Sequence, residues 1–428
     1  MQFFLPESDD LVDRHFDFLA DRYGCGKSTR HDVYAHQLLG GLPCDGVLVS
    51  RSTVDEKKLA EIANVGGIHQ FLSIPISIPV ISDSGAFQYV GLERPPYSPV
   101  DTCEFYAKIG VNYGVTLDHV IVEFDPDFDS ESALLAREVP VEARRRMDIT
   151  ISGAEEMWAI HQRGGYRYEL IGAAQGWSPK SYRSCVERLA AIGYRYIAIG
   201  GLARASDKDI RLVLAELVRG GLHRIAQFHL FGVARLSLMD DYLAAGVVSC
   251  DSASTIFQAF KSDKENYHSP AKNYTAVRIP STAGGQHRSP KVRKILKPWL
   301  ENGDEDDAEK ELKRIAAQKV LERLSRLEQE ALARVRSYAR REIDLTEAMK
   351  ALVAYDDEFG ESRKAYRDFE ETLRDRPWES CPCAICREIG VEVVILRGND
   401  RNRRRGFHNT WVFYEAFKQK RFELQRKG

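Results

Sequence analysis

The stretch YELIGAAQGWSPKSYRSCVERLAAIGYRYIAIGG (168–201) contains a complete strand–helix–strand unit. Its two ends are apolar runs of the kind that form strands buried on both faces of a parallel sheet. Between them, apolar residues recur at helical spacing, and the pattern stops at Gly193, a residue type that commonly ends helices. A strand, a helix and a second strand in this order are typical of a parallel α/β fold.

The same alternation continues over most of the first 260 residues, where helical stretches such as SDKDIRLVLAELVRGG separate the apolar runs. The predicted strands are DGVLVS (45–50), SIPVISD (77–83), YGVTLD (113–118), YELIGAAQ (168–175), YIAIGG (196–201), RIAQFHLFG (224–232) and GVVSCDS (246–252). Roughly seven or eight strand–helix units over about 250 residues favour a closed TIM (β/α)8 barrel over an open sheet.

The composition changes after residue 260, which divides the chain into three predicted parts. Residues 1–260 form the barrel. Residues 261–375 start as a polar, loop-like stretch up to residue 300 and continue as charged amphipathic helices, so we predict a mostly helical insertion. Residues 376–428 contain a cysteine cluster, an apolar strand VEVVIL, a basic loop RGNDRNRRRG and a final amphipathic helix. We predict that they form a zinc-binding subdomain and the last barrel helix.

Charge and hydropathy set limits on the class of protein. The formal net charge of the 428 residues is −2, so global charge argues neither for nor against a nucleic-acid partner, and any such surface must be local. No apolar run is long enough for a membrane span, and the first residues, MQFFLPESDD, lack a signal-peptide pattern. We therefore expect a cytoplasmic protein that has no membrane partner.

The eight cysteines are distributed unevenly. Five are scattered, and Cys381, Cys383 and Cys386 lie within the six residues CPCAIC. His408 follows 22 positions after Cys386. Three thiolates and one imidazole complete the tetrahedral shell of a structural zinc ion and leave no position for a catalytic water. For His408, a core or helix-capping role is the alternative.

Polar or glycine residues stand at the C-terminal ends of several predicted strands. They are Asp83, Asp118, Gln175, Gly200, Gly201 and Asp251. In a TIM barrel this rim carries the active site. Any one of the aspartates could instead cap the following helix. For three aspartates and one glutamine on separate strands, capping alone is the weaker interpretation.

Short motifs in the barrel and the cysteine cluster resemble those of the tRNA-guanine transglycosylase superfamily. They occur in the family's order: DSGAFQ (83–88), GVTLD (114–118), IGAAQG (171–176), AIGGL (198–202), HLFGVA (229–234), CDSAS (250–254), and CPCAIC with His408-Asn409. FFLPESDDLVD and DVYAHQLLGGLPCDGVLVS, near the N-terminus, resemble the DpdA branch, the DNA-guanine transglycosylases that place 7-deazaguanines in DNA. Two features depart from the pattern: Ala86 replaces a motif glycine, and Cys381 follows Asp251 only after about 130 positions.

The resemblance implies base exchange by double displacement. Asp251 is then the nucleophile that attacks C1′, expels guanine and holds the sugar as a covalent ester. Asp83 is then the general acid/base. The alternative for Asp83 is a turn residue before Ser84-Gly85, because Asp-Ser-Gly is ordinary turn chemistry.

The resemblance also implies a base pocket at the rim. Guanine and 7-deazaguanine share one polar edge, so one pocket can hold the leaving and the entering base in turn. Asp118 suits the N1–H and N2–H2 donors, while Gln175 and the Gly201 backbone N–H suit O6. The predicted substrate-binding residues are Asp118, Gln175, Gly200, Gly201, Ser84 and Phe87. Phe87 is expected to stack on the base, and a core position is its alternative.

A base inside a duplex must be flipped out before it can react, and binding of the backbone needs positive charge. Two basic runs, HRSPKVRKILK (287–297) and RGNDRNRRRG (397–406), are candidates. The predicted nucleic-acid contacts are Arg288, Lys291, Arg293, Lys294, Arg401, Arg403, Arg404 and Arg405. A solvated surface is the alternative for both runs.

The leading hypothesis is replacement of guanine in DNA by a 7-deazaguanine, with 7-cyano-7-deazaguanine as the expected base. Its partners are DNA and the free base, and zinc is its structural cofactor. The alternatives are the same reaction on tRNA, a non-catalytic nucleic-acid-binding subunit, and a zinc hydrolase, which the complete Cys3His shell disfavours. Participation of helper proteins from a DNA-modification system, and the oligomeric state, are left open.

Overall fold

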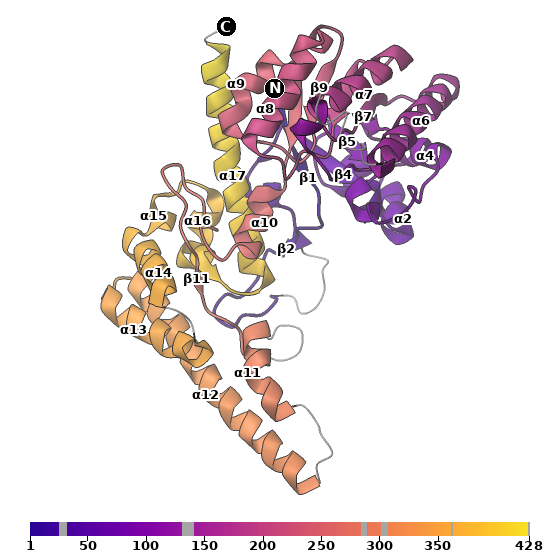
Figure 1. Cartoon of the computed structure of the whole chain (residues 1–428). Coiled ribbons are helices and arrows are strands. Elements are labelled where there is room, and N and C mark those ends of the chain that lie inside the picture. Colours follow the sequence, from indigo (N-terminus) through magenta and orange to yellow (C-terminus); the bar gives the residue numbers. More distant parts are fainter. Residues whose placement is uncertain (25–31, 131–140, 284–288, 301–306, 361–362, 427–428) are drawn as a thin grey trace. The chain divides into compact units, whose positions relative to one another are not determined.

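The computed structural model describes residues 1–24, 32–130, 141–283, 289–300, 307–360 and 363–426 (Figure 1). The chain divides into two compact units. The barrel unit comprises Met1–Asp9, Pro43–Ser254 and Tyr414–Gly428, and the helical unit comprises Asp10–Leu42 and Thr255–Phe413. Each unit is therefore assembled from segments that lie far apart in the sequence.

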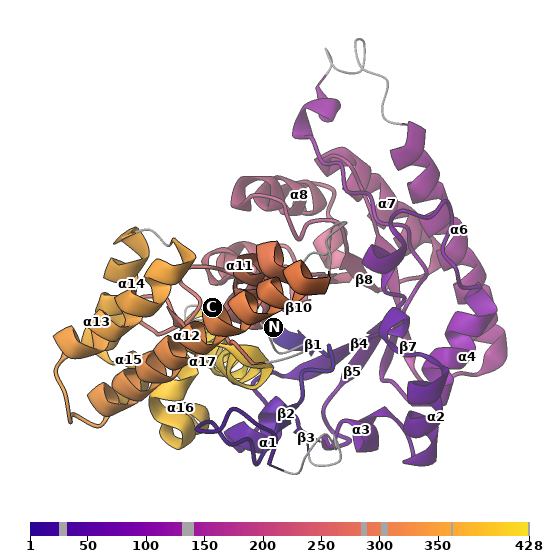
Figure 2. The same ribbon diagram turned by 90° about the horizontal axis from the view of Figure 1, so that it is seen from below.

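The barrel unit is a closed parallel β-barrel with helices around it (Figure 2). Its described strands follow the order β1-β10-β9-β8-β7-β6-β5-β4. They are β1 (Gln2–Pro6), β4 (Gly46–Ser50), β5 (Val80–Asp83), β6 (Tyr113–Val115), β7 (Glu169–Ala174), β8 (Tyr196–Ile199), β9 (Gln227–Leu230) and β10 (Val247–Asp251). The predicted TIM (β/α)8 barrel is confirmed.

Strand β1 is the one that the sequence pattern did not predict. Phe4 of β1 pairs with Asp251 of β10 on one side and with Gly46 of β4 on the other, so this strand closes the barrel. Phe3 and Phe4 are fully buried. The strand precedes every strand–helix unit, and Pro6 ends it early, so alternation could not reveal it.

The stretch from 168 to 201 forms the predicted unit: strand β7, helix α7 (Pro179–Ile192) and strand β8. Ser178 is the N-cap of this helix, and its side chain accepts a hydrogen bond from the Ser181 backbone N–H, which satisfies one otherwise unpaired donor of the first turn. Its apolar face is buried, and Gly193, at a φ of 133°, ends it. The rim at the end of β7 is thereby held at a defined position.

The described part of the barrel unit contains further helices. They are α2 (Glu56–Asn64), α3 (Ile68–Phe71), α4 (Pro99–Ile109), α6 (Val141–Gly164), α8 (Asp207–Arg219), α9 (Met239–Ala244) and the end of α17 (Gly398–Gln425). Short 3-10 turns, η2 (Arg51–Thr53), η3 (Ala86–Tyr89), η4 (Pro126–Asp129), η5 (Leu222–Arg224) and η6 (Leu236–Leu238), lie between elements. Among the described residues, no helix combines the length and the apolar character that a membrane crossing requires.

The helical unit has one hydrophobic core that joins segments from both ends of the chain. Val12, Val277, Leu324, Trp378 and Ile395 all belong to it. Its small sheets pair β2 (Val12–Asp13) with β3 (Asp32–Val33) and β11 (Val277–Arg278) with β12 (Ile395–Leu396). Its helices are α1 (Ala35–Leu39), α10 (Ser254–Lys261, from Thr255), α11 (Pro290–Leu300), α12 (Asp307–Ala339), α13 (Leu345–Asp356), α14 (Arg363–Asp375), α15 (Pro377–Ser380), α16 (Ala384–Ile389) and the start of α17, with 3-10 turns η8 (Asp357–Phe359) and η9 (Gly390–Val394).

Three local expectations for this part of the chain differ from the structure. The stretch up to residue 300 is not all loop, because α11 forms where Val292 and Leu296, four residues apart, are both buried. Only the end of VEVVIL is a strand, since η9 occupies most of it. RGNDRNRRRG is not a loop, because all but its first residue belongs to α17. The predicted insertion and the predicted zinc subdomain also share the core described above.

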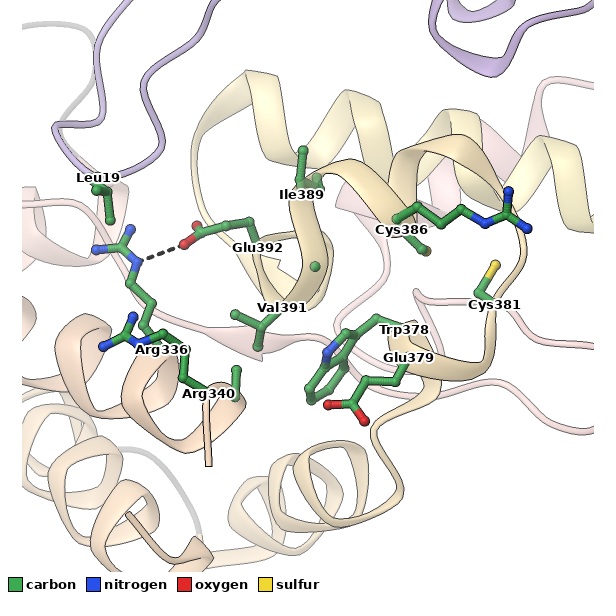
Figure 3. A pocket seen from close by; sticks show the side chains of 13 residues that line it. Leu19, Arg336, Arg340, Trp378, Glu379, Cys381, Cys386, Ile389, Val391 and Glu392 are labelled. Carbon is green, nitrogen blue, oxygen red and sulfur yellow. Dashed lines mark hydrogen bonds and ion pairs between the residues drawn. The ribbon is translucent and has the colours of Figure 1, made fainter. Parts of the chain in front are cut away.

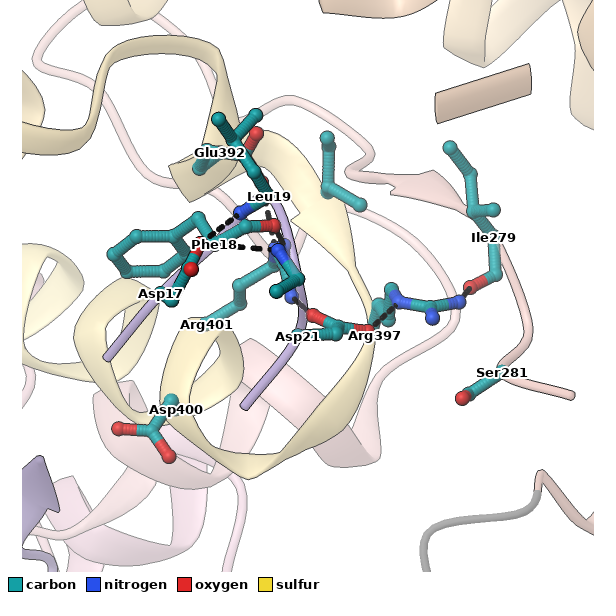
Figure 4. A network of polar contacts seen from close by, with 12 residues as sticks. Asp17, Phe18, Leu19, Asp21, Ile279, Ser281, Glu392, Arg397, Asp400 and Arg401 are labelled. Carbon is teal, nitrogen blue, oxygen red and sulfur yellow. Dashed lines mark hydrogen bonds and ion pairs between the residues drawn. The ribbon is translucent and has the colours of Figure 1, made fainter. Parts of the chain in front are cut away.

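Arg401, Arg404 and Arg405 are buried in the helical unit, which contradicts their prediction as nucleic-acid contacts. Figure 4 shows Arg401 next to Asp21 and Glu392. Arg401 pairs with Asp21, and its Nε lies 2.7 Å from Glu392 Oε2. Arg404 pairs with Asp400 and donates to the Asp13 carbonyl. Arg405 donates to the carbonyls of Ala259, Val393 and Ile395.

These arginines are buried because several of their hydrogen-bond and ion-pair partners come from parts of the sequence far from the helix. Asp21 and Asp13 come from the N-terminal segment of the helical unit and lie more than 370 positions before the arginines. A buried guanidinium is tolerated only when carboxylates or carbonyls replace its water. Arg403 differs, because it keeps about a third of its side chain exposed and lies 3.6 Å from Asp10.

Replacement of Arg401 by alanine is expected to lower the free energy of unfolding of the helical unit by about 3–5 kcal/mol, because it leaves buried carboxylates short of a partner. The matched change Arg403→Ala removes an arginine from the same helix that is partly exposed, and should cost at most about 1 kcal/mol. Urea unfolding followed by circular dichroism measures both. Equal effects would show that the buried network does not stabilise this unit.

Candidate active site and metal centre

The polar rim residues face the barrel interior because side chains alternate along a strand. Ile81, Ala173 and Ala198 belong to one buried cluster built by the strands of the barrel. Two positions further on, towards the C-terminal end, the same alternation places Asp83, Gln175 and Gly200. The rim side chains are thus continuations of the inward-facing rows of the core.

Asp83 ends β5 and is close to two other carboxylates. Its pKa is raised to about 7, chiefly by burial, and the negative charges of Asp118 and Asp251 raise it further, while a hydrogen bond with Ser50 lowers it. Its Oδ1 is sealed from water and has no hydrogen-bond partner. A carboxyl group that titrates near neutral pH can both give and take a proton.

Asp118 is buried and held by two neighbours. Gln175 Nε2 donates to Asp118 Oδ2 at 2.7 Å, and Ser84 Oγ lies 3.4 Å from Oδ1. Burial raises the pKa of Asp118 to about 6, and these two hydrogen bonds act in the opposite direction. Tyr89, on the 3-10 turn η3, holds Ser84 and the Asp118 backbone in position. Its hydroxyl lies 2.6 Å from Ser84 Oγ and donates to the Asp118 carbonyl at 3.0 Å.

Gly200 and Gly201 leave room for this arrangement. A Cβ at position 200 would lie 2.2 Å from Gln175 Nε2. A Cβ at position 201, where φ is +79°, would meet the Tyr182 hydroxyl at 2.8 Å and the Ile121 carbonyl at 2.9 Å. Side chains at either position would displace Gln175 or the adjacent backbone, so glycine is required here.

Asp251 ends β10 and is buried. Its Oδ1 accepts hydrogen bonds from His229 Nε2 at 3.1 Å and from the Gly232 backbone N–H at 3.0 Å. Phe87 lies on the 3-10 turn η3 and is 54% exposed. The core alternative for Phe87 therefore does not hold.

Several residues of the site are not among those that the sequence predicts. His229, Ser249, Tyr196 and Tyr89 are the main ones. The first three occupy inward-facing positions of strands that were predicted with nearly the right bounds. Alternation alone could have placed them inside the barrel, but nothing in the sequence connects them to one another.

The first basic run, HRSPKVRKILK (287–297), lies mostly on α11 in the helical unit. Lys294 is exposed and Lys291 is partly buried, and burial together with the nearby charge of Arg278 lowers the pKa of Lys291. Arg293 is exposed on the same helix. Arg288, which was also predicted to contact nucleic acid, lies outside the described residues.

Cys381, Cys383, Cys386 and His408 form a group that could hold a metal ion, with their ligand atoms all within 4.8 Å of one another. Zn–S bonds of about 2.3 Å and Zn–N bonds of about 2.0–2.1 Å at tetrahedral angles place sulfur and nitrogen about 3.6 Å apart. The observed distances from His408 Nδ1 to the three Sγ atoms are 3.6, 3.4 and 3.4 Å. The four residues therefore fit a tetrahedral ion.

Neighbouring groups orient these ligands. His408 Nε2 lies 2.8 Å from the His268 carbonyl, an arrangement that leaves Nδ1 for the metal. The Tyr267 ring stacks on His408 with a centroid distance of 4.2 Å, and its hydroxyl lies 3.3 Å from Cys386 Sγ. Cys383 is the N-cap of helix α16, and its Sγ accepts a hydrogen bond from the Cys386 backbone N–H.

A cavity of about 530 Å³ in the helical unit opens beside the cysteines (Figure 3). Cys381, Cys386, Trp378, Arg336 and Arg387 are among its lining residues. Arg336 is already paired with Glu392 at 2.6 Å. None of the barrel carboxylates lines this cavity.

Comparison with known proteins identifies the family of the chain. The family model for queuine tRNA-ribosyltransferase (TGT) matches residues 30–262. A DNA-guanine transglycosylase of Salmonella montevideo is 36% identical over 97% of this chain and 96% of its own length.

More distant relatives match only part of the chain. A tRNA-guanine(15) transglycosylase of Pyrobaculum aerophilum is 27% identical over 42% of this chain and 34% of its own length. A queuine tRNA-ribosyltransferase of Caldanaerobacter subterraneus is 27% identical over 40% of this chain and 47% of its own length. The chain therefore belongs to the tRNA-guanine transglycosylase superfamily and is an enzyme of that superfamily.

Proposed function

We propose that the protein replaces guanine in DNA with a 7-deazaguanine through a covalent ester on Asp251. The observation that carries this proposal is the convergence of three carboxylates from different strands on one site. Asp83 and Asp251 end β5 and β10, Asp118 follows the end of β6 by three residues, and the negative charges of Asp118 and Asp251 raise the pKa of Asp83. Base exchange at C1′ needs a nucleophilic carboxylate and a second carboxyl group that moves protons. The barrel end supplies both, together with a third carboxylate for recognition of the base.

The proposed reaction has two displacements at C1′. An Asp251 oxygen forms a bond to C1′ while the bond from C1′ to guanine breaks, and Asp83 gives its proton to the departing base. Asp83, now a carboxylate, takes a proton from the ring N–H of the entering base. That base forms the new bond to C1′ as the ester bond to Asp251 breaks. Two inversions retain the configuration.

Asp118 and Gln175 are proposed to read the base. A carboxylate accepts two parallel hydrogen bonds, as the N1–H and N2–H2 edge requires. Gln175 uses one amide hydrogen on Asp118, and its second remains for O6. The Gly201 N–H, Ser84 and Phe87 complete the proposed pocket, with Phe87 stacked on the base from its exposed position. The 7-cyano form is the proposed entering base.

DNA is favoured over tRNA as the substrate by the extent of the similarity. The relative named for DNA matches nearly the whole chain, whereas the tRNA-named relatives above match less than half of it. The similarity to the DNA-named relative, which covers 97% of this chain, therefore extends into the helical unit. Lys291, Arg293, Lys294 and Arg403 are the described residues that we retain as proposed backbone contacts.

We propose that the metal of the Cys3His group is zinc and that its role is structural. When bound, it would cross-link the turn at Cys381–Cys386 to helix α17 and, with its four protein ligands, would leave no position for water. The chain's own residues prepare the site, because His408 is oriented by the His268 carbonyl and by the Tyr267 ring.

Exchange of labelled guanine into nucleic acid tests the proposed function. The wild-type protein should incorporate label into plasmid DNA but not into bulk tRNA, and nucleosides from DNA treated with 7-cyano-7-deazaguanine should contain the modified base by mass spectrometry. Asp251→Asn should abolish exchange while DNA binding persists. The exposed Glu156→Gln change on α6 is the matched control and should exchange normally. Label in tRNA alone would establish the RNA alternative.

The pH dependence of exchange follows from the two raised pKa values. Below about pH 6 Asp118 becomes protonated and can no longer accept both donors of the base, and above about pH 7 Asp83 loses the proton that the leaving base needs. We expect a bell-shaped profile of kcat/KM with its maximum between these values. A rate that keeps rising above pH 8 would mean that protonated Asp83 is not required.

Loss of one metal ligand should remove the metal and destabilise the helical unit. Cys386→Ser is expected to reduce zinc from one ion per chain to a small fraction, because structural zinc binding contributes on the order of 10 kcal/mol in small domains. Elemental analysis and thermal unfolding measure the two effects. Cys185→Ser, at a buried cysteine of α7 outside the group, should keep its zinc. Full metal content in Cys386→Ser would contradict the assigned shell.

A further inference from the structure

The two oxygens of the Asp251 carboxylate have different surroundings. Oδ1 accepts from His229 Nε2 at 3.1 Å and from the Gly232 N–H at 3.0 Å. Within the part of the chain that the structure describes, Oδ2 has no hydrogen-bond partner. One oxygen is thus anchored and the other is left for a reaction.

His229 connects Asp251 to a chain of hydroxyl groups deeper in the barrel. Its Nδ1 lies 2.7 Å from Ser249 Oγ, and Ser249 Oγ lies 2.5 Å from the Tyr196 hydroxyl. The imidazole is fully buried. The rings of Phe4 and Phe231 contact it edge-on, at centroid distances of 6.0 and 4.8 Å. The ring therefore has little freedom to rotate.

If the His229 imidazole is neutral, the Asp251 carboxylate at the end of the series fixes the direction of each hydrogen bond. An ionised Asp251 can only accept, so His229 Nε2 must carry the proton and Nδ1 must accept. Ser249 then donates to Nδ1, and Tyr196 donates to Ser249 Oγ. Each donor in the series has one acceptor, and the series ends on the carboxylate.

We propose that His229 is a positioning residue for Asp251, held in one tautomer by Ser249 and Tyr196. It fixes Oδ1 so that Oδ2 faces C1′, and it donates to Oδ1 while negative charge returns to the carboxylate as the ester breaks. This inference rests on the proposed function, because it assigns the nucleophile to Asp251.

The chemistry of the second displacement gives His229 a defined effect. In the ester, Oδ2 is bonded to C1′ and Oδ1 is the ester carbonyl oxygen. When the entering base attacks, the electron pair of the C1′–Oδ2 bond returns to the carboxylate. Fixed N–H donors at Oδ1 stabilise that charge without reorganising. No proton needs to leave His229 in either step.

The test compares His229→Phe with His229→Gln in exchange of labelled guanine into plasmid DNA. His229→Phe keeps an aromatic ring but loses the donor, so kcat should fall by about 100-fold, the cost of a misplaced reacting group. The KM for the free base should stay within about threefold, since Asp118 and Gln175 are untouched. His229→Gln can still donate to Asp251 and should recover at least about 10-fold of the lost rate.

The series of hydrogen bonds predicts which substitutions are coupled. Ser249→Ala and Tyr196→Phe should each lower kcat by about 10-fold in the wild-type background, one lost hydrogen bond each. In the His229→Phe background they should have no further effect, because the series already ends before Asp251. A purely structural role would instead give additive losses.

His69→Gln is the matched control, because His69 is also buried and its Nε2 bonds a backbone carbonyl, that of Ile78, at 2.9 Å. It should lower stability without changing kcat. Wild-type kcat in both His229 variants, or additive effects of Ser249→Ala, would overturn the inference while leaving base exchange intact. If His229→Phe does not fold, the kcat values of His229→Gln and Ser249→Ala still test whether the hydrogen bonds that lead to Asp251 affect the rate. An inactive wild-type protein would instead refute the proposed function itself.

Discussion

The alternation of side chains along parallel strands is the constraint on which the site depends. Because strand direction is uniform in the closed barrel, every strand delivers its last inward-facing residue to the same end. In the observed register, Phe4 of β1 pairs directly with Asp251 of β10. Residues from positions 83 to 251 can therefore meet, although no local contact along the sequence brings them together.

Gathering three carboxylates in one place has an electrostatic cost, and the surrounding groups determine how each acid behaves. Asp118 receives donors from Gln175 and Ser84, and Asp251 receives them from His229 and Gly232. Asp83 keeps one oxygen without a partner, and burial raises its pKa to about 7. Burial, neighbouring charge and hydrogen bonding together decide which acid in a site keeps its proton near neutral pH.

The sequence predicts the barrel and its polar rim because both arise from patterns with a fixed period. The Cys3His group is equally visible, since three of its ligands lie within six residues. Tertiary partners explain most of the failures. Arg401, Arg404 and Arg405 look like a basic surface until Asp21, Glu392 and Asp13 are known to face them. The link between His229 and Tyr196 is hidden for the same reason, because Ser249 joins two strands that are separate in the sequence.

The discontinuous make-up of the two units has a consequence for synthesis on the ribosome. The barrel unit needs both its first nine residues and those after residue 413, and the arginines of α17 pair with residues 13 and 21 of the helical unit. The helical unit is complete only when α17 has emerged as far as Phe413, and the barrel unit only when the later turns of α17 have followed. The segments of each unit that are made first must therefore wait for segments made much later, and loss of residues 1–9 or of those after 413 would damage a barrel unit whose remaining sequence lies far from the cut.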